Sequence, residues 1–279
     1  MLTPDIFTVT GSGPKLLLIP GSGLTRGTFA TPIAALSQRF RCVSYDLRGM
    51  GKYRYDGRDY SLDAFVADAV YVLDQIGADR AHVLGYSLGG VVALELALRM
   101  PERVASLALV STYDRADALI RIRCAMLTEL LLAGSPSAFA RASVLTAFAP
   151  GYVVANGEKV EAEIAARIAR WQVADAAERQ ALVGHWRAVA AHDVTDRLGQ
   201  IRCPTWVAVG AWDAVTPVEH AHRLASGIAG ARLTVFPGAA HRLIDLPEFA
   251  AQTLDFLTSG AVAASFSARE VSRLMPAKE

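Results

Sequence analysis

A chain of 279 residues can bury one large core, as a single α/β domain with an insertion or as two smaller domains. It carries 28 Lys and Arg against 27 Asp and Glu, a net charge of +1, so no strong field would attract nucleic acid or an acidic membrane. Apolar residues make up 52% of the sequence, but each apolar run stops well short of membrane-spanning length. We expect one soluble domain with a lid and a small-molecule substrate, without nucleic-acid or membrane partners, and leave a homodimer open.

The N-terminus and the cysteines indicate the compartment and exclude common metal motifs. The first ten residues lack the basic and apolar segments of a secretory signal, which predicts a cytoplasmic protein. The three cysteines, Cys42, Cys124 and Cys203, are widely spaced and odd in number, which fits neither a disulfide framework nor a paired metal motif. Of the six histidines only His220 and His222 lie close together, and residues two apart on a helix diverge. We predict no metal and no cofactor.

Short β-rich runs alternate with helical patterns in the first and last parts of the chain. The predicted strands cover residues 15–20, 40–46, 81–86, 104–112, 205–210 and 232–237. This alternation predicts a mainly parallel sheet with helices on both faces. Residues 61–77 form a predicted surface helix, with Ser61 as its N-cap and Gly77 as its stop. A second helix follows residue 87, is apolar on nearly all sides and ends at Pro101, as a buried helix would.

The pattern changes after the fourth predicted strand. The next eighty or so residues read as interrupted helices without a convincing strand. We therefore predict a helical cap inserted into a two-part core and followed by a tail, with the cap at 113–191, the core at 1–112 and 192–260, and the tail at 261–279.

Two features of the predicted cap bear on substrate choice. Trp171 and Trp186 each belong to an apolar stripe at helical spacing. Such stripes usually pack on a core, but a cap can turn part of one toward substrate, so both are candidate substrate-binding residues. Six cap arginines suit an anionic substrate, although a solvated helical face explains them more simply: Arg115, Arg121, Arg123, Arg141, Arg167 and Arg170.

A G-x-S-x-G motif occupies residues 85–89, directly after an apolar run and directly before a helix. This context is typical of a nucleophile elbow, a sharp turn that strains the serine backbone and needs glycines where a Cβ would collide. The helix behind the serine points its N–H groups and positive dipole end at the site where negative charge develops. Ser87 is the candidate nucleophile.

A serine hydroxyl needs a base to take its proton and an acid to orient that base. In the fold that carries this elbow, the order along the chain is Ser, then Asp or Glu, then His. Asp213 follows the fifth predicted strand and His241 the sixth, so both loops should open at the same sheet edge as Ser87. Taken alone, Asp213 reads as a turn or cap residue and His241 as a surface histidine, but their order favours a triad. Asp114 is the alternative acid and His82 the alternative base.

An oxyanion hole requires the N–H after the nucleophile and a second N–H from the loop after an early strand. Leu88 supplies the first. The glycine-rich loop 20–24 follows the first predicted strand, and we expect the second donor to be Ser22, with Gly23 as the alternative. The loop lacks the Lys-Ser/Thr ending of a P-loop, so a phosphate-binding role is less favoured.

Three further segments accompany the elbow and the triad: D-x-R-G-x-G at 46–51, P-E-R-V at 101–104 and I-x-x-P-T at 201–205. Together these motifs resemble the α/β-hydrolase superfamily of small esterases, lactonases and carbon–carbon bond hydrolases, over about residues 16–257. The first half is similar to 3-oxoadipate enol-lactonases and aminoacrylate hydrolases, whereas the cap matches neither. The chain departs from the superfamily at Pro20-Gly21, where His-Gly is usual.

The resemblance implies an α/β-hydrolase fold and hydrolysis of a small carboxylic ester or lactone through an acyl-enzyme. Carbon–carbon bond cleavage, acyl transfer and thioester hydrolysis are alternatives, because they use the same triad. A non-catalytic ligand-binding protein is least favoured, because the triad is intact.

Overall fold

The computed structural model describes residues 4–54 and 60–265. Its central sheet consists of β1 (Phe7–Thr10), β2 (Lys15–Ile19), β3 (Arg41–Tyr45), β4 (Ala81–Tyr86), β5 (Val104–Val110), β6 (Thr205–Gly210) and β7 (Arg232–Phe236). The strands lie in the order β1-β3-β2-β4-β5-β6-β7. β1 pairs antiparallel with β3, and every other neighbouring pair is parallel.

The predicted, mainly parallel sheet is confirmed. Each of the six predicted strands contains one observed strand, from β2 to β7, with ends that agree to within two residues. The sequence does not reveal β1, which has only four residues, of which three are exposed. An exposed edge strand lacks the alternating or continuous apolar pattern that reveals the buried ones.

Helices cover both faces of the sheet, and side chains of one strand therefore reach two cores. In β2, Leu17 and Ile19 belong to one buried cluster, whereas Leu16 and Leu18 belong to the other. The first face is covered by α2 (Leu62–Gln75), α3 (Leu88–Arg99) and α9 (Val218–Gly227), and the second by α1 (Ala30–Leu36) and α10 (Pro247–Ser265). Short 3₁₀ helices occupy Pro4–Ile6, Arg26–Phe29, Pro101–Arg103, Thr195–Gln200 and Leu243–Asp245.

The two helices predicted next to the elbow form as expected. Ser61 caps α2 by accepting a hydrogen bond from the N–H of Ala64 at 3.1 Å, and Gly77 follows the helix with φ +62°. α3 is buried along most of its length and ends at Arg99, before Pro101. Its N-terminus lies directly behind Ser87, which positions the site.

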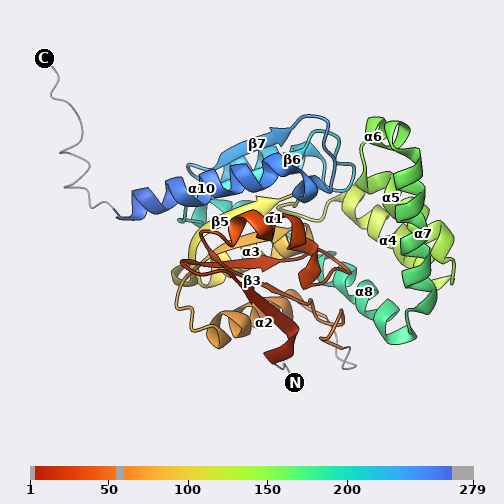
Figure 1. Ribbon diagram of the computed structural model, residues 1–279, viewed down its shortest axis with the longest axis horizontal. Coiled ribbons are helices and arrows are strands. Elements are labelled where there is room, and N and C mark those ends of the chain that lie inside the picture. The colour runs from red at the N-terminus through yellow and green to blue at the C-terminus, as the bar shows by residue number, and fades with distance from the viewer. Residues whose placement is uncertain (1–3, 55–59, 266–279) are drawn as a thin grey trace, which may run out of the picture.

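Between β5 and β6 the chain forms only helices: α4 (Ala118–Leu132), α5 (Pro136–Ala147), α6 (Pro150–Ala155), α7 (Gly157–Val173) and α8 (Ala176–Val189). Figure 1 shows α4 to α7 gathered at one end of the molecule, beside the sheet, while α8 runs back toward the core. These helices fall inside the predicted cap segment, and they cover the end of the sheet where Ser87 lies.

The two ends of the cap are joined to each other at a narrow neck. Arg115 and Asp193 form an isolated antiparallel bridge, Ala116 donates its N–H to the carbonyl of His192 at 2.8 Å, and Val194 donates its N–H to the carbonyl of Asp114 at 3.0 Å. The chain therefore leaves and re-enters the core at almost the same place.

The C-terminal end of the chain belongs in part to α10. The predicted tail starts at residue 261, inside this helix, and from residue 266 onward it lies outside the described residues. No helix in the described ranges is both long enough and apolar enough to cross a membrane.

Candidate active site

Ser87 lies on a sharp turn between β4 and α3. Its backbone has φ +56° and ψ −120°, a strained conformation for a residue with a Cβ. The turn is held because Ser87 donates its N–H to Val110 and its carbonyl accepts from Thr112 Oγ1 at 2.8 Å. Glycine is required on both sides, since a Cβ on Gly85 would overlap the backbone of Gly89.

The structure brings together the three residues predicted as a triad, although they are far apart in the sequence. Ser87 Oγ lies 3.2 Å from His241 Nε2. His241 Nδ1 lies 2.9 Å from Asp213 Oδ2 and 3.1 Å from Oδ1. These distances suit a hydroxyl that donates to a neutral imidazole, which in turn donates to a carboxylate.

Asp213 is held by the loop that follows β6. Its Oδ1 accepts the N–H groups of Val215 and Thr216, and its Oδ2 accepts the Thr216 hydroxyl at 2.9 Å. Burial alone would raise the pKa of this carboxyl, but the charge of His241 and the hydrogen bonds from His241 and Thr216 outweigh burial and lower the pKa. Asp213 is therefore ionised and rigidly placed beside the imidazole.

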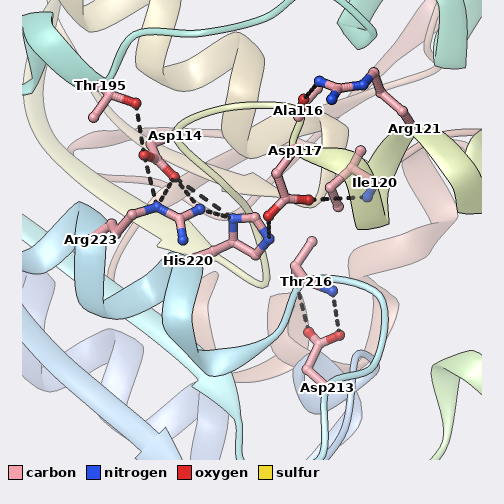
Figure 2. Close-up of polar contacts among 10 residues, drawn as sticks. All are labelled: Asp114, Ala116, Asp117, Ile120, Arg121, Thr195, Asp213, Thr216, His220 and Arg223. Carbon is pink, nitrogen blue, oxygen red and sulfur yellow. Dashed lines mark hydrogen bonds and ion pairs between the residues drawn. The ribbon is translucent and has the colours of Figure 1, made fainter.

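Asp114, the alternative acid, has other partners. Figure 2 shows the carboxylates of Asp114 and Asp213 in separate networks. Asp114 accepts from Arg223 Nε at 3.0 Å and from Thr195 Oγ1 at 3.0 Å, and His220 Nδ1 lies 3.7 Å away. These groups lower its pKa although burial opposes them. Asp114 thus links the cap neck to α9. His82, the alternative base, contacts Ser106 at 2.8 Å in the sheet.

The predicted oxyanion donors lie at the base of the cavity, but only some of their N–H groups are free. Leu88 is the first residue of α3, where an N–H has no intrahelical acceptor. Within the described part of the chain, the N–H of Ser22 has no acceptor. Gly23 is different, because its N–H donates to His185 Nδ1 at 3.2 Å and so is not available to an oxyanion. Leu88 and Ser22 are the pair that fits.

His185 was not predicted as part of the site, yet it fixes the oxyanion loop from the cap. It comes from α8 and is fully buried. Its Nδ1 accepts from Gly23 and its Nε2 donates to the carbonyl of Arg48 at 2.7 Å, so one tautomer satisfies both contacts. Burial lowers the pKa of His185 to about 4, against the smaller effect of its bond to Arg48. The ring is neutral and acts as a fixed acceptor.

A cavity of about 300 Å³ lies between the elbow and the cap. Ser22, Ser87, Leu88 and His241 line its base. Its remaining wall is mostly apolar and comes from the cap, including Ile120, Leu127, Phe139, Leu182 and Val189. The volume suits a small molecule, and an apolar wall combined with polar and charged side chains is typical of a ligand site.

Trp171 and Trp186, predicted as substrate-binding, both line this cavity. Each ring packs on Phe139, with centroids 5.5 Å and 6.2 Å apart. The stripe that contains Trp171 also packs as core, as apolar stripes usually do, because Val160 and Ile164 belong to a small buried cluster inside the cap. One stripe thus contributes to packing and to the cavity wall.

The cap arginines divide into two groups. Arg123, Arg167 and Arg170 line the cavity, whereas Arg115, Arg121 and Arg141 are exposed and lie outside it. A solvated helical face therefore accounts for only the second group. The sequence offered no signal to separate them, because the spacing of arginines within helices of unknown orientation does not tell which side faces the elbow.

The family described as the alpha/beta hydrolase fold matches residues 14–246. The chain belongs to this family. The predicted membership of the α/β-hydrolase superfamily is confirmed, and the chain is a hydrolase of that fold.

Relatives and solved structures match most of this α/β-hydrolase. It is 33% identical over 235 residues to the "Putative carbamate hydrolase RutD" of Azorhizobium caulinodans, across 84% of this chain and 87% of the relative. A hydrolase of known structure from Pseudomonas aeruginosa PA01 is 31% identical, with a TM-score of 0.78 over 90% of this chain and 93% of that one. The enol-lactonase from Burkholderia xenovorans LB400 shares the fold at 23% identity, with a TM-score of 0.77 over 90% of this chain and 95% of that one.

Proposed function

We propose that this α/β-hydrolase cleaves a small carboxylic ester or lactone through an acyl-enzyme intermediate. The observation that carries the proposal is the continuous contact from Ser87 Oγ to His241 to Asp213 at the base of a small cavity. The free N–H groups of Ser22 and Leu88 at the same place support it.

In the first half of the reaction, Ser87 Oγ attacks the substrate carbonyl carbon while His241 Nε2 takes the hydroxyl proton. Asp213 stabilises the imidazolium, and the N–H groups of Leu88 and Ser22 bind the oxyanion of the tetrahedral intermediate. The intermediate collapses as His241 returns its proton to the leaving alcohol oxygen. The acyl group stays on Ser87, and in a lactone the released hydroxyl stays attached to it.

In the second half, His241 takes a proton from water, and the resulting hydroxide attacks the acyl-enzyme carbonyl. The second tetrahedral intermediate uses the same oxyanion donors and expels Ser87 Oγ, which recovers its proton from His241. The products are a carboxylic acid and a free enzyme, so atoms and protons balance.

A carbamate is the second candidate substrate. The name of the relative at 33% identity favours it, and a carbamate carbonyl accepts the same attack by the same residues. Carbon–carbon bond hydrolysis and acyl or thioester transfer stay open as outcomes of substrate profiling, because they require the same triad.

The decisive test combines a fluorophosphonate probe with a panel of phenyl esters, lactones, carbamates and β-diketones. We expect Ser87→Ala to lose labelling and to lose turnover by at least about 10³-fold. Ser143→Ala is the matched control, because Ser143 also lines the cavity, and it should keep its labelling. Labelling and turnover that survive in Ser87→Ala would contradict the proposal, and the preferred member of the panel identifies the bond.

A further inference from the structure

Four arginines line the cavity, and three of them have a carboxylate partner. The partners lie 2.8 Å from a guanidinium nitrogen in the pairs Arg167–Glu163, Arg170–Glu178 and Arg242–Asp245. The fourth, Arg123, has no carboxylate within ion-pair distance among the described residues. Arg123 is therefore the one arginine of the four that lacks a carboxylate in direct contact among the described residues.

The hydrogen-bond donors of Arg123 are also largely unused. A guanidinium has five N–H donors. Nη2 of Arg123 donates to Thr146 Oγ1 at 3.3 Å, a long contact. Nε is buried and has no hydrogen-bond partner within the described residues. Nη1 makes no hydrogen bond within the described residues, so the end of the guanidinium, unlike the buried Nε, keeps donors for a ligand in the cavity.

The surroundings of Arg123 suit an anion close to the triad. Ile120 and Leu127 of the same helix line the cavity beside it, and low polarity strengthens charge attraction. Burial lowers the pKa of Arg123, and the negative charge of Asp213 is among the effects that oppose burial. The guanidinium stays protonated at physiological pH and lies within electrostatic range of the triad's acid.

We propose that Arg123 binds a free carboxylate of the substrate, so that the substrates are small esters or lactones with a second, ionised carboxyl group. A carboxylate can accept two parallel hydrogen bonds from a guanidinium, which adds orientation to charge attraction. The reaction in this inference rests on the proposed hydrolase function, whereas the anion binding does not.

The kinetic test compares matched anionic and neutral esters. The phenyl monoester of glutarate and the phenyl ester of glutaramate differ in a carboxylate against an amide of similar size. 3-Acetoxybenzoate and 3-acetoxybenzamide also differ in a carboxylate against an amide, but here the group lies on the leaving phenol. We expect Arg123→Gln to lower the anionic-to-neutral ratio of kcat/KM by about 10-fold to 100-fold in at least one pair, and Arg123→Lys to restore part of it.

The matched control is Arg121→Gln, which removes the same charge from the same helix but from an exposed side chain outside the cavity. Its ratio should stay within about twofold of the parent protein, since a distant exposed charge is screened. An equal fall in both variants would mean that only the overall charge matters and would overturn the inference. Thermal midpoints of all variants check that the fold is intact.

A binding test separates this inference from the proposed reaction. In the Ser87→Ala background, glutarate should bind at least about 10-fold more weakly after Arg123→Gln, while glutaramide binding changes little, as measured by calorimetry. If no ester is cleaved but glutarate binding depends on Arg123, the proposed reaction fails and the anion site stands. If esters are cleaved but neither the ratio nor glutarate binding depends on Arg123, the anion site is wrong.

Discussion

Glycines at the nucleophile elbow and glycines in α6 and α7 meet different surroundings. A Cβ on Gly85 or Gly89 would overlap backbone atoms at the elbow. A Cβ on Gly151 or Gly157, both in cap helices, would meet nothing within 4 Å. The core around Ser87 is therefore fixed by close backbone contact, whereas these two cap positions tolerate larger side chains.

Exposed apolar residues show the same division. Of the ten large apolar side chains exposed in the described residues, eight belong to the cap, including Ile122 at 68%, Val154 at 87% and Val173 at 84%. The sheet, in contrast, is covered on both faces. The elbow is thus fixed by close backbone contact, whereas the cap has open positions and exposed apolar side chains, and we expect substrate choice to depend on the cap.

Replacing the acid in the core should have the largest effect on turnover. Asp213→Asn should lower kcat by about 10⁴-fold, because an amide cannot hold the required tautomer of His241 or stabilise its charge. Asp114→Asn should instead lower the free energy of unfolding, by about 3 kcal/mol or more, because Arg223 loses a buried partner. Steady-state kinetics and urea denaturation of both variants measure the two effects. If Asp114→Asn loses more turnover than Asp213→Asn, the assignment of the acid is wrong.

Alanine substitutions at glycines test the difference between the crowded elbow and the open cap positions directly. Gly85→Ala should lower the free energy of unfolding by more than about 3 kcal/mol, because its Cβ meets backbone that cannot yield. Gly151→Ala, the matched change in α6, should be neutral or stabilising by up to about 1 kcal/mol, because alanine restricts the unfolded chain. Denaturation midpoints measure both. Equal effects at the two positions would contradict the proposed difference in rigidity.

His185 of the cap bonds to Gly23 and Arg48 of the core. It should therefore make the free energy of unfolding depend on pH. Its pKa is about 4 in the folded protein and 6.5 in the reference state, so between these values the unfolded chain binds the extra proton. The contribution of His185 to the free energy of unfolding is therefore complete above pH 6.5. It falls by about 3 kcal/mol as the pH drops to 4.

The measurement is urea denaturation of the parent protein and of His185→Gln from pH 4 to pH 8. An amide keeps a donor and an acceptor but does not titrate, so the variant should lose this part of the pH dependence. His222→Gln is the control, since His222 is exposed on α9 and should keep the full dependence. An unchanged pH profile in His185→Gln would show that His185 does not connect the loop to the cap as described.

The tryptophans with which the cap lines the cavity should have a smaller effect, on substrate preference. Trp171→Ala or Trp186→Ala should change the ranking of acyl groups by about 10-fold, because each ring lines the cavity and large apolar contacts there discriminate between transition states. Trp212→Ala, an exposed tryptophan outside the cavity, should leave the ranking unchanged. The ratios of kcat/KM across a series of esters measure the effect. Lost stability with an unchanged ranking would assign both rings to packing alone.

The sequence predicted the core well because its signals are local. A buried parallel strand reads as a continuous apolar run, and the loops that follow such strands meet at one edge of the sheet. Ser87, Asp213 and His241 each follow such a run, so their meeting could be expected from their order alone.

The roles of His185 and Arg123 could not be predicted, because they depend on how the cap is seated. His185 reaches Gly23 from 162 positions along the chain, and nothing in α8 indicates that contact. Arg123 and Arg121 are alike in sequence and differ only in the side of α4 on which they lie. The orientation of a helix with apolar residues on several sides is settled by packing, which the sequence pattern does not encode.

The neck at the base of the cap has a consequence for how such a protein can diversify. Asp114 and Val194 are hydrogen-bonded, so the two ends of the inserted segment are already close together. The entropy of closing a loop grows only slowly with its length, so segments of quite different size fit the same pair of ends. A segment of different size can therefore be grafted between Asp114 and Val194, provided that it supplies an acceptor for the N–H of Gly23 in place of His185, and the same triad would then face a different cavity wall.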